Sequence, residues 1–288
     1  MFSPAEYQLV DFGDGRKLER FGPYLIDRPS PAAADMPRAQ PELWSRATAR
    51  FELQGDLRGG ERGRWVPSEA LPQRWSVGFG PLRFEVKPTD FGHLGVFPEQ
   101  AANWDWIAEQ VRARASEPRR VKMLNLFAHT GGSTLAAAQA GAEVVHVDSS
   151  KSAVAWARRN AELSELAFAP IRWIVEDAAR FVRRELNRGN RYDAVILDPP
   201  SYGHGPAGET WKLEADLPAL LAACAELTAG RCRFILLTCH TPSVTPATAE
   251  KLVGVGFRAN RVTVSELSIA CATGHRLSCG VFARWSAE

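Results

Sequence analysis

Five short apolar runs, each followed by a segment with helical periodicity, constrain the fold of this chain more than any other feature. They occupy residues 121 to 127, 143 to 148, 171 to 176, 192 to 197 and 233 to 238. Strands that are apolar along their whole length are buried on both faces, which is typical of a parallel sheet covered by helices. Two further runs, at residues 260 to 267 and 278 to 285, are joined by a segment too short and too polar for a crossover helix, so we expect them to pair antiparallel at one edge. The pattern predicts a doubly wound, Rossmann-like α/β domain with a mostly parallel seven-stranded sheet and an antiparallel edge strand.

Residues 1 to 85 follow a different pattern. Prolines are frequent there, and apolar residues alternate with polar ones in YQLVDFGDGRKLERF and RWSVGFGPLRFEV. The first of these segments predicts a hairpin around Gly13-Asp14-Gly15. We therefore expect a small β-rich N-terminal module in residues 1 to 85, followed by the α/β domain in residues 86 to 288.

Composition narrows the class of protein. The formal net charge is +2 over 288 residues, so the charge of the whole molecule does not by itself require a nucleic-acid partner. No stretch approaches the roughly 18 apolar residues of a membrane span, and the first residues lack the basic start and apolar core of a signal peptide. We expect a cytoplasmic protein without a membrane partner.

The cysteines argue against two kinds of stabilising site. All lie in the last quarter of the chain, and their number, five, is odd. Their spacing differs from that of metal-binding knuckles. The sequence therefore predicts reduced thiols, no disulfide framework and no metal site.

Basic residues form two local clusters. Each could contact phosphates, or could instead be a solvated helix face with its flanks. The first cluster comprises Arg112, Arg114, Arg119, Arg120 and Lys122, and the second comprises Arg180, Arg183, Arg184, Arg188 and Arg191.

The loop after the first predicted strand, within LNLFAHTGGSTLAAAQAG (residues 124 to 141), has the character of a ligand site. Gly131 and Gly132 predict a tight turn that lets the backbone approach a ligand closely, and Ser133 or Thr134 is placed to cap the helix that follows. The exposed amides at the start of that helix favour an anionic group such as a carboxylate. A dinucleotide-binding fold would carry G-x-G-x-x-G here. Because FAHTGGS lacks it, a nicotinamide enzyme is the weaker alternative.

Acidic residues stand at the ends of the next three predicted strands. Asp148 ends the second, where a carboxylate can accept two hydrogen bonds from a ribose diol. The third ends in Glu176-Asp177-Ala178, where an acid could accept from an adenine amino group, and the fourth ends in Asp198-Pro199-Pro200, whose prolines fix the direction of the carbonyls. Each acid alone could also cap a helix or lie solvated at a strand end. Their occurrence at successive strand ends predicts a cofactor site along one edge of the sheet.

These segments together carry a family resemblance. LNLFAHTGG, HVDSSKSAVAWARRN, EDAARF, VILDPPSYG and LLTCH, in this order and spacing, resemble the class I S-adenosylmethionine-dependent methyltransferases. More narrowly, they resemble the branch that includes ribosomal RNA large-subunit methyltransferases making 5-methylcytosine. The resemblance covers about residues 85 to 288 and implies S-adenosylmethionine as cofactor and RNA as partner.

The resemblance also implies which residues line the cofactor. It places Asp148 at the ribose, Asp177 at the adenine, and Asp198 with Pro199 beside the transferred methyl group. The full set of implied cofactor contacts is Phe97, Gln100, Asn125, Phe127, His129, Thr130, Gly131, Gly132, Asp148, Ser149, Asp177, Ala178, Asp198 and Pro199.

One departure from the branch, and one from the wider class that the branch itself tolerates, affect this assignment. FGHLGVFPEQ resembles a segment that closes over the cofactor and reads G-x-F-x-D-Q followed by arginine; Gly95, Phe97 and Gln100 match it, whereas Glu99 and Ala101 do not. Many class I enzymes also carry an acid at the position of Asn125.

For the acceptor, the resemblance favours a ribosomal RNA cytosine carbon. A thiolate that adds to the pyrimidine ring makes the neighbouring carbon nucleophilic, and a nearby acid stabilises the charge on the ring. The cysteine of a T-C-S segment is the nucleophile in that branch, which implies Cys239 as nucleophile and Asp198 as acid. His240 replaces the serine and could lower the thiol pKa or simply cap the strand. Pro200, Tyr202 and His240 are the candidate substrate contacts.

Two alternatives stay open. Methyltransferases of exocyclic amines commonly have an aromatic residue directly after Asp/Asn-Pro-Pro, whereas here Ser201 precedes Tyr202. A methyltransferase acting on a nitrogen of RNA or of a small molecule would keep Cys239 as core packing. A more remote alternative is a non-catalytic RNA-binding module.

Overall fold

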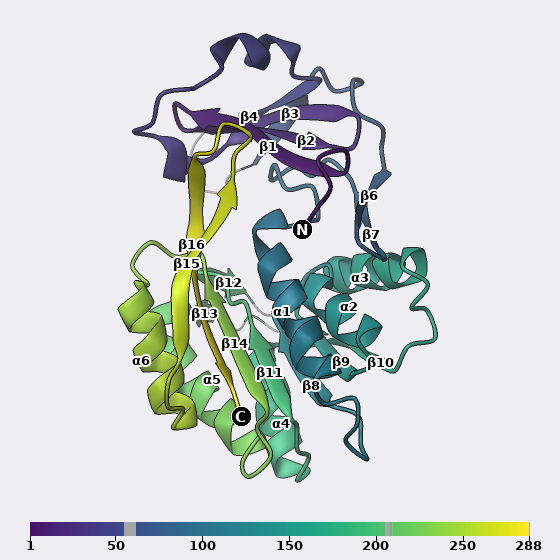
Figure 1. The fold of residues 1–288 in the computed structure, drawn as a ribbon, viewed down its shortest axis with the longest axis vertical. Helices are drawn as coiled ribbons and strands as arrows, with labels where there is room; N and C mark the ends of the chain where they lie inside the picture. Colours follow the sequence, from purple (N-terminus) through teal and green to yellow (C-terminus); the bar gives the residue numbers. More distant parts are fainter. Residues whose placement is uncertain (55–61, 205–207, 209, 288) are drawn as a thin grey trace. The chain divides into compact units, whose positions relative to one another are not determined.

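The computed structural model describes residues 1–54, 62–204, 208 and 210–287 (Figure 1). The chain forms two compact units. The first contains Met1–Ala101 and Ser268–Cys279, and the second contains Ala102–Leu267 and Gly280–Glu288. The predicted boundary between residues 85 and 86 separates an N-terminal module from a catalytic domain. It stays a prediction.

The first unit is rich in β-structure. Five strands form one sheet in the order β1-β2-β3-β4-β5, and β6 pairs with β7 in a separate antiparallel hairpin. β1 and β2 pair antiparallel as far as Gly13 and Arg16, which confirms the hairpin predicted there. The elements are β1 (Tyr7–Gly13), β2 (Arg16–Phe21), β3 (Tyr24–Pro29), β4 (Ala49–Leu53), β5 (Gly63–Val66), β6 (Trp75–Phe79) and β7 (Leu82–Val86), with short 3-10 helices at Pro31–Ala33, Pro41–Arg46 and Pro98–Gln100.

A buried ion cluster holds this sheet together. Glu19 of β2 is fully buried and accepts hydrogen bonds from the Tyr7 hydroxyl at 2.8 Å and from Arg28 Nη2 at 3.1 Å. Burial raises the pKa of Glu19, but the charges of Arg28 and Lys17 outweigh it and lower this pKa to about 2. Glu19 is therefore ionised in its buried position.

The second unit contains the predicted seven-stranded sheet, in the order β10-β9-β8-β11-β14-β16-β15. The strands β10, β9, β8, β11 and β14 run parallel to one another, and β16 runs antiparallel to β14. The doubly wound, mostly parallel sheet is thus confirmed, with the antiparallel strand β16 lying inside the edge strand β15. The strands are β8 (Lys122–Leu126), β9 (Glu143–Asp148), β10 (Ile171–Val175), β11 (Ala194–Leu197), β14 (Phe234–Cys239), β15 (Thr263–Ala270) and β16 (Arg276–Ser286).

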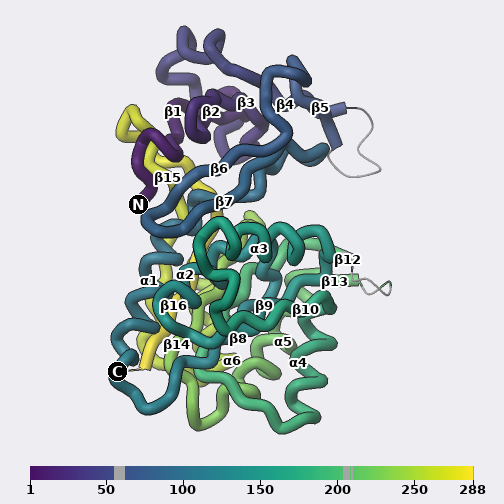
Figure 2. The backbone as a smooth tube through the Cα atoms, turned by 90° about the vertical axis from the view of Figure 1, so that its right-hand side faces the viewer, coloured from purple at the N-terminus to yellow at the C-terminus, as the bar shows by residue number. Residues whose placement is uncertain are grey.

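Helices cover both faces of this sheet (Figures 1 and 2). Side chains of α4, α5 and α6 pack on one face against Val195, Leu197 and Leu237. Side chains of α1 and α2 pack on the other against Met123 and Ile196. The helices are α1 (Ala101–Arg112), α2 (Gly132–Gln139), α3 (Lys151–Leu163), α4 (Ala178–Asn187), α5 (Leu213–Leu227) and α6 (Pro246–Phe257), and a small hairpin of β12 (Tyr202–His204) and β13 (Thr210–Lys212) precedes α5.

Alternation along the strands assigns each side chain to one of these faces. On β14, Leu237 and Cys239 belong to the core beneath α4 to α6, and Leu236 belongs to the opposite core. Because successive side chains of a strand point to opposite faces, Thr238 and Cys239 face in opposite directions. Within the described residues, no helix is both long and apolar enough to span a membrane.

Candidate active site

The loop between β8 and α2 is held in an uncommon backbone conformation. Phe127 and His129 have φ values of 54° and 46°, which residues with a Cβ rarely adopt. Strain of about 1–3 kcal/mol per residue persists only where surrounding contacts hold the backbone. Here the Ala128 amide donates to the Val147 carbonyl at 3.1 Å and the His129 amide donates to Asp148 Oδ2 at 2.8 Å. The loop is therefore fixed by β9 and not by its own sequence preferences.

The two glycines of this loop are required for different physical reasons. Gly131 has a φ of 91° and is the N-cap of α2, so it supplies the left-handed turn that the sequence predicts. Gly132 makes room for an indole ring: a Cβ there would lie 2.8 Å from Trp104 Nε1. The predicted cap by Ser133 or Thr134 is wrong, because α2 has no side-chain cap and Thr134 is used elsewhere.

Asn125 is almost fully buried, at 2% exposure, directly before this loop. Its Nδ2 donates to the Thr134 hydroxyl at 2.9 Å, and the same hydroxyl lies 2.9 Å from Nδ1 of buried His146. Thr130 is also buried, and its carbonyl accepts from Asn160 Nδ2 at 2.9 Å. Polar residues under the loop are thus bound to one another.

Asp148 ends β9 and holds two loops at once. Its Oδ2 accepts from the His129 amide and its Oδ1 from the Ser150 amide, each at 2.8 Å. A carboxylate has about four lone-pair positions, so these two bonds leave capacity for further donors such as the two hydroxyls of a ribose. Ser149 follows it at the same strand end.

A small, partly open cavity of about 50 Å³ lies along these strand ends. It collects six of the predicted site residues from the ends of β8, β9, β10 and β11, namely Phe127, Asp148, Ser149, Asp177, Ala178 and Pro200. Val147, Glu176, Gly203 and Trp211 complete its lining.

Trp211 was not anticipated from the sequence. Its ring packs on Phe127 with centroids 4.9 Å apart, and its Nε1 donates to the Pro200 carbonyl at 2.7 Å. It thus forms an apolar wall of the cavity and fixes the loop that follows Asp198. The only signal was a tryptophan beside the start of a helical segment, which more often indicates core packing.

Asp177 both caps a helix and lines this cavity. Its Oδ1 accepts from the Arg180 amide at 2.8 Å at the start of α4. Asp177 therefore caps α4, which is one of the two alternatives for this residue, and it also lines the cavity. The neighbouring acid, Glu176, is paired with Arg184 at 2.5 Å.

Asp198 follows β11 and binds two residues from the end of β14. Its Oδ1 accepts from the Thr238 hydroxyl and lies 3.2 Å from His240 Nε2. Burial raises the pKa of Asp198, but the charge and hydrogen bond of His240 and the hydrogen bond of Thr238 outweigh it, so the pKa lies below its ordinary value. This direction is unfavourable for the predicted role of Asp198 as an acid at neutral pH and favours an ionised acceptor.

Cys239 lies between the two residues that bind Asp198, and its side chain belongs to the core beneath α4 to α6. It is 0% exposed. Burial, together with the negative charge of Asp198, raises the pKa of the thiol to about 12. In this conformation the thiolate needed for nucleophilic attack is disfavoured.

The Asp-Pro-Pro loop is held on its outer side. Besides the bond from Trp211 to the Pro200 carbonyl, the Ser201 carbonyl accepts from the Leu213 amide at 3.1 Å. Pro199 is buried and Pro200 is exposed. Tyr202 is 54% exposed and stands between two residues that line the cavity, Pro200 and Gly203.

The remaining predicted cofactor contacts, Phe97 and Gln100, belong to the first unit. Phe97 is half-buried beside His93, with ring centroids 5.8 Å apart, and Gln100 is buried at the end of a 3-10 helix. Their predicted contact with the cofactor stays a prediction.

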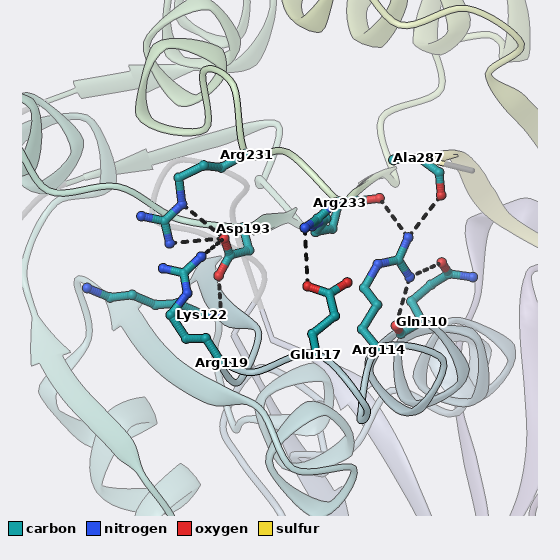
Figure 3. A network of polar contacts seen from close by, with 9 residues as sticks. All are labelled: Gln110, Arg114, Glu117, Arg119, Lys122, Asp193, Arg231, Arg233 and Ala287. Carbon is teal, nitrogen blue, oxygen red and sulfur yellow. Dashed lines mark hydrogen bonds and ion pairs between the residues drawn. The ribbon is translucent and has the colours of Figure 1, made fainter.

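Several basic side chains of the two clusters are used inside the fold. Figure 3 shows Arg119 donating to Asp193 at 3.0 Å and Arg114 donating to the Ala287 carbonyl at 2.9 Å. In the second cluster, Arg188 pairs with Glu185 at 3.6 Å. The Arg119 and Arg188 side chains are 59% and 53% exposed, so they lie on the solvated surface while they pair with acidic residues.

The cysteines and the potential metal ligands are the remaining side chains with site chemistry. All five cysteines are free. Within the described ranges, no group of three or more His, Cys, Asp or Glu side chains is arranged to hold a metal ion.

The sequence model of the S-adenosylmethionine-dependent methyltransferase family matches residues 38–249. A crystal structure of a SAM-dependent methyltransferase from Agrobacterium tumefaciens is 38% identical, with a TM-score of 0.89 over 98% of this chain and 91% of that chain. A protein assigned as a SAM-dependent methyltransferase from Streptococcus mutans is 16% identical, with a TM-score of 0.75 over 98% and 75% of the two chains, and it shares the fold.

A curated relative matches a smaller region. Ribosomal RNA large subunit methyltransferase I of Aeromonas salmonicida is 33% identical over 118 residues, which are 40% of this chain and 28% of that protein. The match therefore spans little more than a quarter of the relative's length.

Proposed function

The chain belongs to the S-adenosylmethionine-dependent methyltransferases, and on this premise we propose that it transfers a methyl group from S-adenosylmethionine to a nitrogen of an RNA base. The observation that carries the proposal is the cavity along the ends of β8 to β11. It brings Asp148, Asp177 and the loop after Asp198 to one place. These groups come from three separate strand ends, so local capping needs alone do not explain their convergence.

The residues of this cavity fit a nucleoside cofactor. Phe127, Ala178 and Trp211 provide flat or apolar walls for an adenine. Asp148 retains acceptor capacity for a ribose diol after binding two amides. Asp177 lines the same space and supplies an acceptor at the adenine end. Asn125, Thr130 and the loop glycines of the second unit are proposed to complete the cofactor contacts.

Asp198 is the proposed catalytic acceptor. When bound, the cofactor supplies an electrophilic methyl group on sulfonium sulfur. The base nitrogen attacks this carbon, the C–N bond forms as the C–S bond breaks, and one proton then leaves the nitrogen. An ionised Asp198 can accept an N–H hydrogen bond from the base, stabilise the positive charge that develops on the nitrogen, and take up the departing proton.

Two observations support RNA as the acceptor. The curated relative is named for ribosomal RNA, and the exposed ring of Tyr202 stands beside the cavity, where a base could stack on it. Stacking of a base on an aromatic side chain contributes about 1–3 kcal/mol and tolerates every base.

A second candidate is methylation of a cytosine carbon with Cys239 as nucleophile. The observation that favours it is the position of Cys239 at the end of β14, between the two residues that bind Asp198. It would require the buried thiol to turn from the core beneath α4 to α6 and to lose its proton. Because of this cost, the geometry supports the nitrogen acceptor better.

The experiment that tests the proposal identifies the methylated product. The full chain is incubated with methyl-labelled S-adenosylmethionine and, separately, with total RNA, protein and small-metabolite fractions. Label in RNA, recovered after digestion as an N-methylated nucleoside, is the expected result. Recovery of 5-methylcytidine would favour the second candidate, and label only outside RNA would contradict an RNA acceptor.

A further inference from the structure

A cavity between the first turns of α5 and α6 has no part in the proposed reaction. It belongs to the second unit and has a volume of about 180 Å³, against about 50 Å³ for the cavity along the ends of β8 to β11. The two cavities share no lining residue among those that the structure describes. We call it the α5–α6 cavity, and its walls include Leu213, Glu214 and Leu217 of α5, Ser243 and Val244 of the preceding loop, and Leu252 of α6.

This cavity lies at the carboxyl edge of the seven-stranded sheet, because α5 and α6 begin where the connections after β11 and β14 end. Its walls are joined to the loop that follows Asp198. The Leu213 amide donates to the Ser201 carbonyl at 3.1 Å, and the Ser201 and Thr241 hydroxyl oxygens are 2.6 Å apart. The α5–α6 cavity therefore flanks the proposed acceptor side of the site.

The apolar walls suit one flat ring. Leu213, Leu217 and Val244 are buried, and Leu252 is half-buried. An apolar cavity of roughly 150 Å³ takes up one benzene molecule. The α5–α6 cavity, of about 180 Å³, therefore accommodates a single six-membered ring, whereas a purine would leave part of its fused ring system outside.

A carboxylate at the rim supplies a hydrogen-bond acceptor. Oε1 of Glu214, an exposed residue of α5, accepts from the Ser243 hydroxyl at 2.7 Å. This bond joins the carboxylate to the loop after β14 and restricts its orientation. A carboxylate has about four lone-pair positions, so Glu214 keeps capacity for an amino donor. Apolar walls with a few placed polar groups are typical of ligand sites.

We propose that the α5–α6 cavity binds a cytosine next to the methylated base of the RNA, with the ring between the apolar walls and the N4 amino group on Glu214. Glutamate accepts from cytosine N4 in base recognition, whereas uracil presents a carbonyl oxygen at the same position and is repelled. The inference rests on the proposed function, because it assigns a second base of the same RNA. It adds a sequence preference that stacking on Tyr202 does not supply, since stacking tolerates every base.

The test compares two RNA ligands whose bases have the same ring. Fluorescein-labelled decanucleotides of cytidine and of uridine are titrated with the full chain at one fixed salt concentration, and Kd is measured by fluorescence anisotropy. We expect the wild type to bind the cytidine decamer about tenfold more tightly. Glu214→Gln can accept from cytosine or donate to uracil, so the two Kd values should then differ by less than about twofold.

Matched variants separate recognition from a change in charge. Glu250→Gln removes the same charge from an exposed position of α6 that does not line the cavity, so the about tenfold ratio of the two Kd values should persist. Ser243→Ala keeps the Glu214 carboxylate but removes the hydroxyl bound to it. Its ratio should fall to about threefold, because the carboxylate is then free to turn away from the cavity.

The methyl-transfer experiment of the proposed function separates the two claims. If label enters RNA but the wild type binds both decamers equally, or binds neither, the α5–α6 cavity is not a cytosine site and the proposed function stands. The same conclusion follows if Glu214→Gln keeps the wild-type ratio, or if Glu250→Gln loses it equally. If no label enters RNA, the proposed function is overturned, and this inference falls with it.

Discussion

At the amino edge of the seven-stranded sheet, before β8, β11 and β14, charged side chains bind one another or backbone carbonyls (Figure 3). Asp193, 3% exposed, accepts from Arg119, Arg231 and the Lys122 amide there. At the carboxyl edge, Asp148 accepts hydrogen bonds from the backbone amides of His129 and Ser150, and it lines a cavity. The contrast teaches that a parallel sheet uses charge for stability at one edge and can leave acceptor capacity for a ligand at the other.

The largest expected effect tests the amino edge. Asp193→Ala leaves Arg119, Arg231 and the Lys122 amide without their shared acceptor, and because both guanidinium groups reach solvent the cost is about 1–3 kcal/mol. We expect a loss of that size in the free energy of unfolding, measured with urea, and a Kd for S-adenosylmethionine within about twofold of the wild type.

The matched control at the same edge is Glu117→Ala. The side chains of Glu117 and Arg233 are 36% and 43% exposed, so their ion pair contributes less than about 1 kcal/mol. An equal loss of stability in the Glu117 and Asp193 variants, or weakened cofactor binding in either, would remove the distinction between the two edges.

The next effect tests the carboxyl edge. Asp148→Ala removes the proposed ribose acceptor together with the bond that holds the His129 amide. The Kd for S-adenosylmethionine should rise about 100-fold, since two charge-assisted hydrogen bonds are lost. Asp148→Asn keeps one acceptor oxygen and should lose less. Unchanged binding in the alanine variant would show that the ribose is held elsewhere.

A pH series tests the neutral, buried histidine behind the carboxyl edge. The folded-state pKa of His146 is about 3, below its ordinary value of 6.5, so the unfolded chain binds the extra proton. The associated stability is complete above pH 6.5 and is lost as pH falls toward 3. Between pH 7.5 and 5 the wild type should lose about 2 kcal/mol more than His146→Asn. Parallel pH profiles of the two proteins would contradict a neutral, desolvated His146.

A smaller effect separates the two uses of Asp177. Asp177→Ala removes the cap of α4 and should cost about 1 kcal/mol of unfolding free energy. Asp177→Ser keeps a capping oxygen and should retain most of that stability, yet it lacks the carboxylate proposed at the adenine. Binding by the serine variant that equals wild-type binding would reduce Asp177 to a helix cap.

The sequence predicted the sheet well because its strands are apolar on both faces. Runs such as residues 143 to 148 match β9 residue for residue, and the turn at Gly131 follows from its need for positive φ. Asp148, Asp177 and the loop at Pro200 were placed at one edge because parallel strands end together.

The missed features depend on contacts between distant segments. Trp211 reaches Phe127 across 84 positions of sequence, and Gly132 is small because Trp104 packs on it. The burial of Cys239 depends on the helices α4 to α6 that cover this face of β14, so a residue next to a site in sequence can be enclosed in the core. Thr134, predicted as a cap, is turned inward because β8 and β9 bring Asn125 and His146 together beneath it.

The most direct test of the account is the methyl-transfer rate of a Cys239→Ala protein. Because the thiol is buried in the core and holds its proton, and because Asp198 is the proposed acceptor, kcat on RNA per folded molecule should stay within about threefold of the wild type. Loss of activity by about a thousandfold or more, with the cofactor still bound, would contradict the account and make Cys239 the nucleophile.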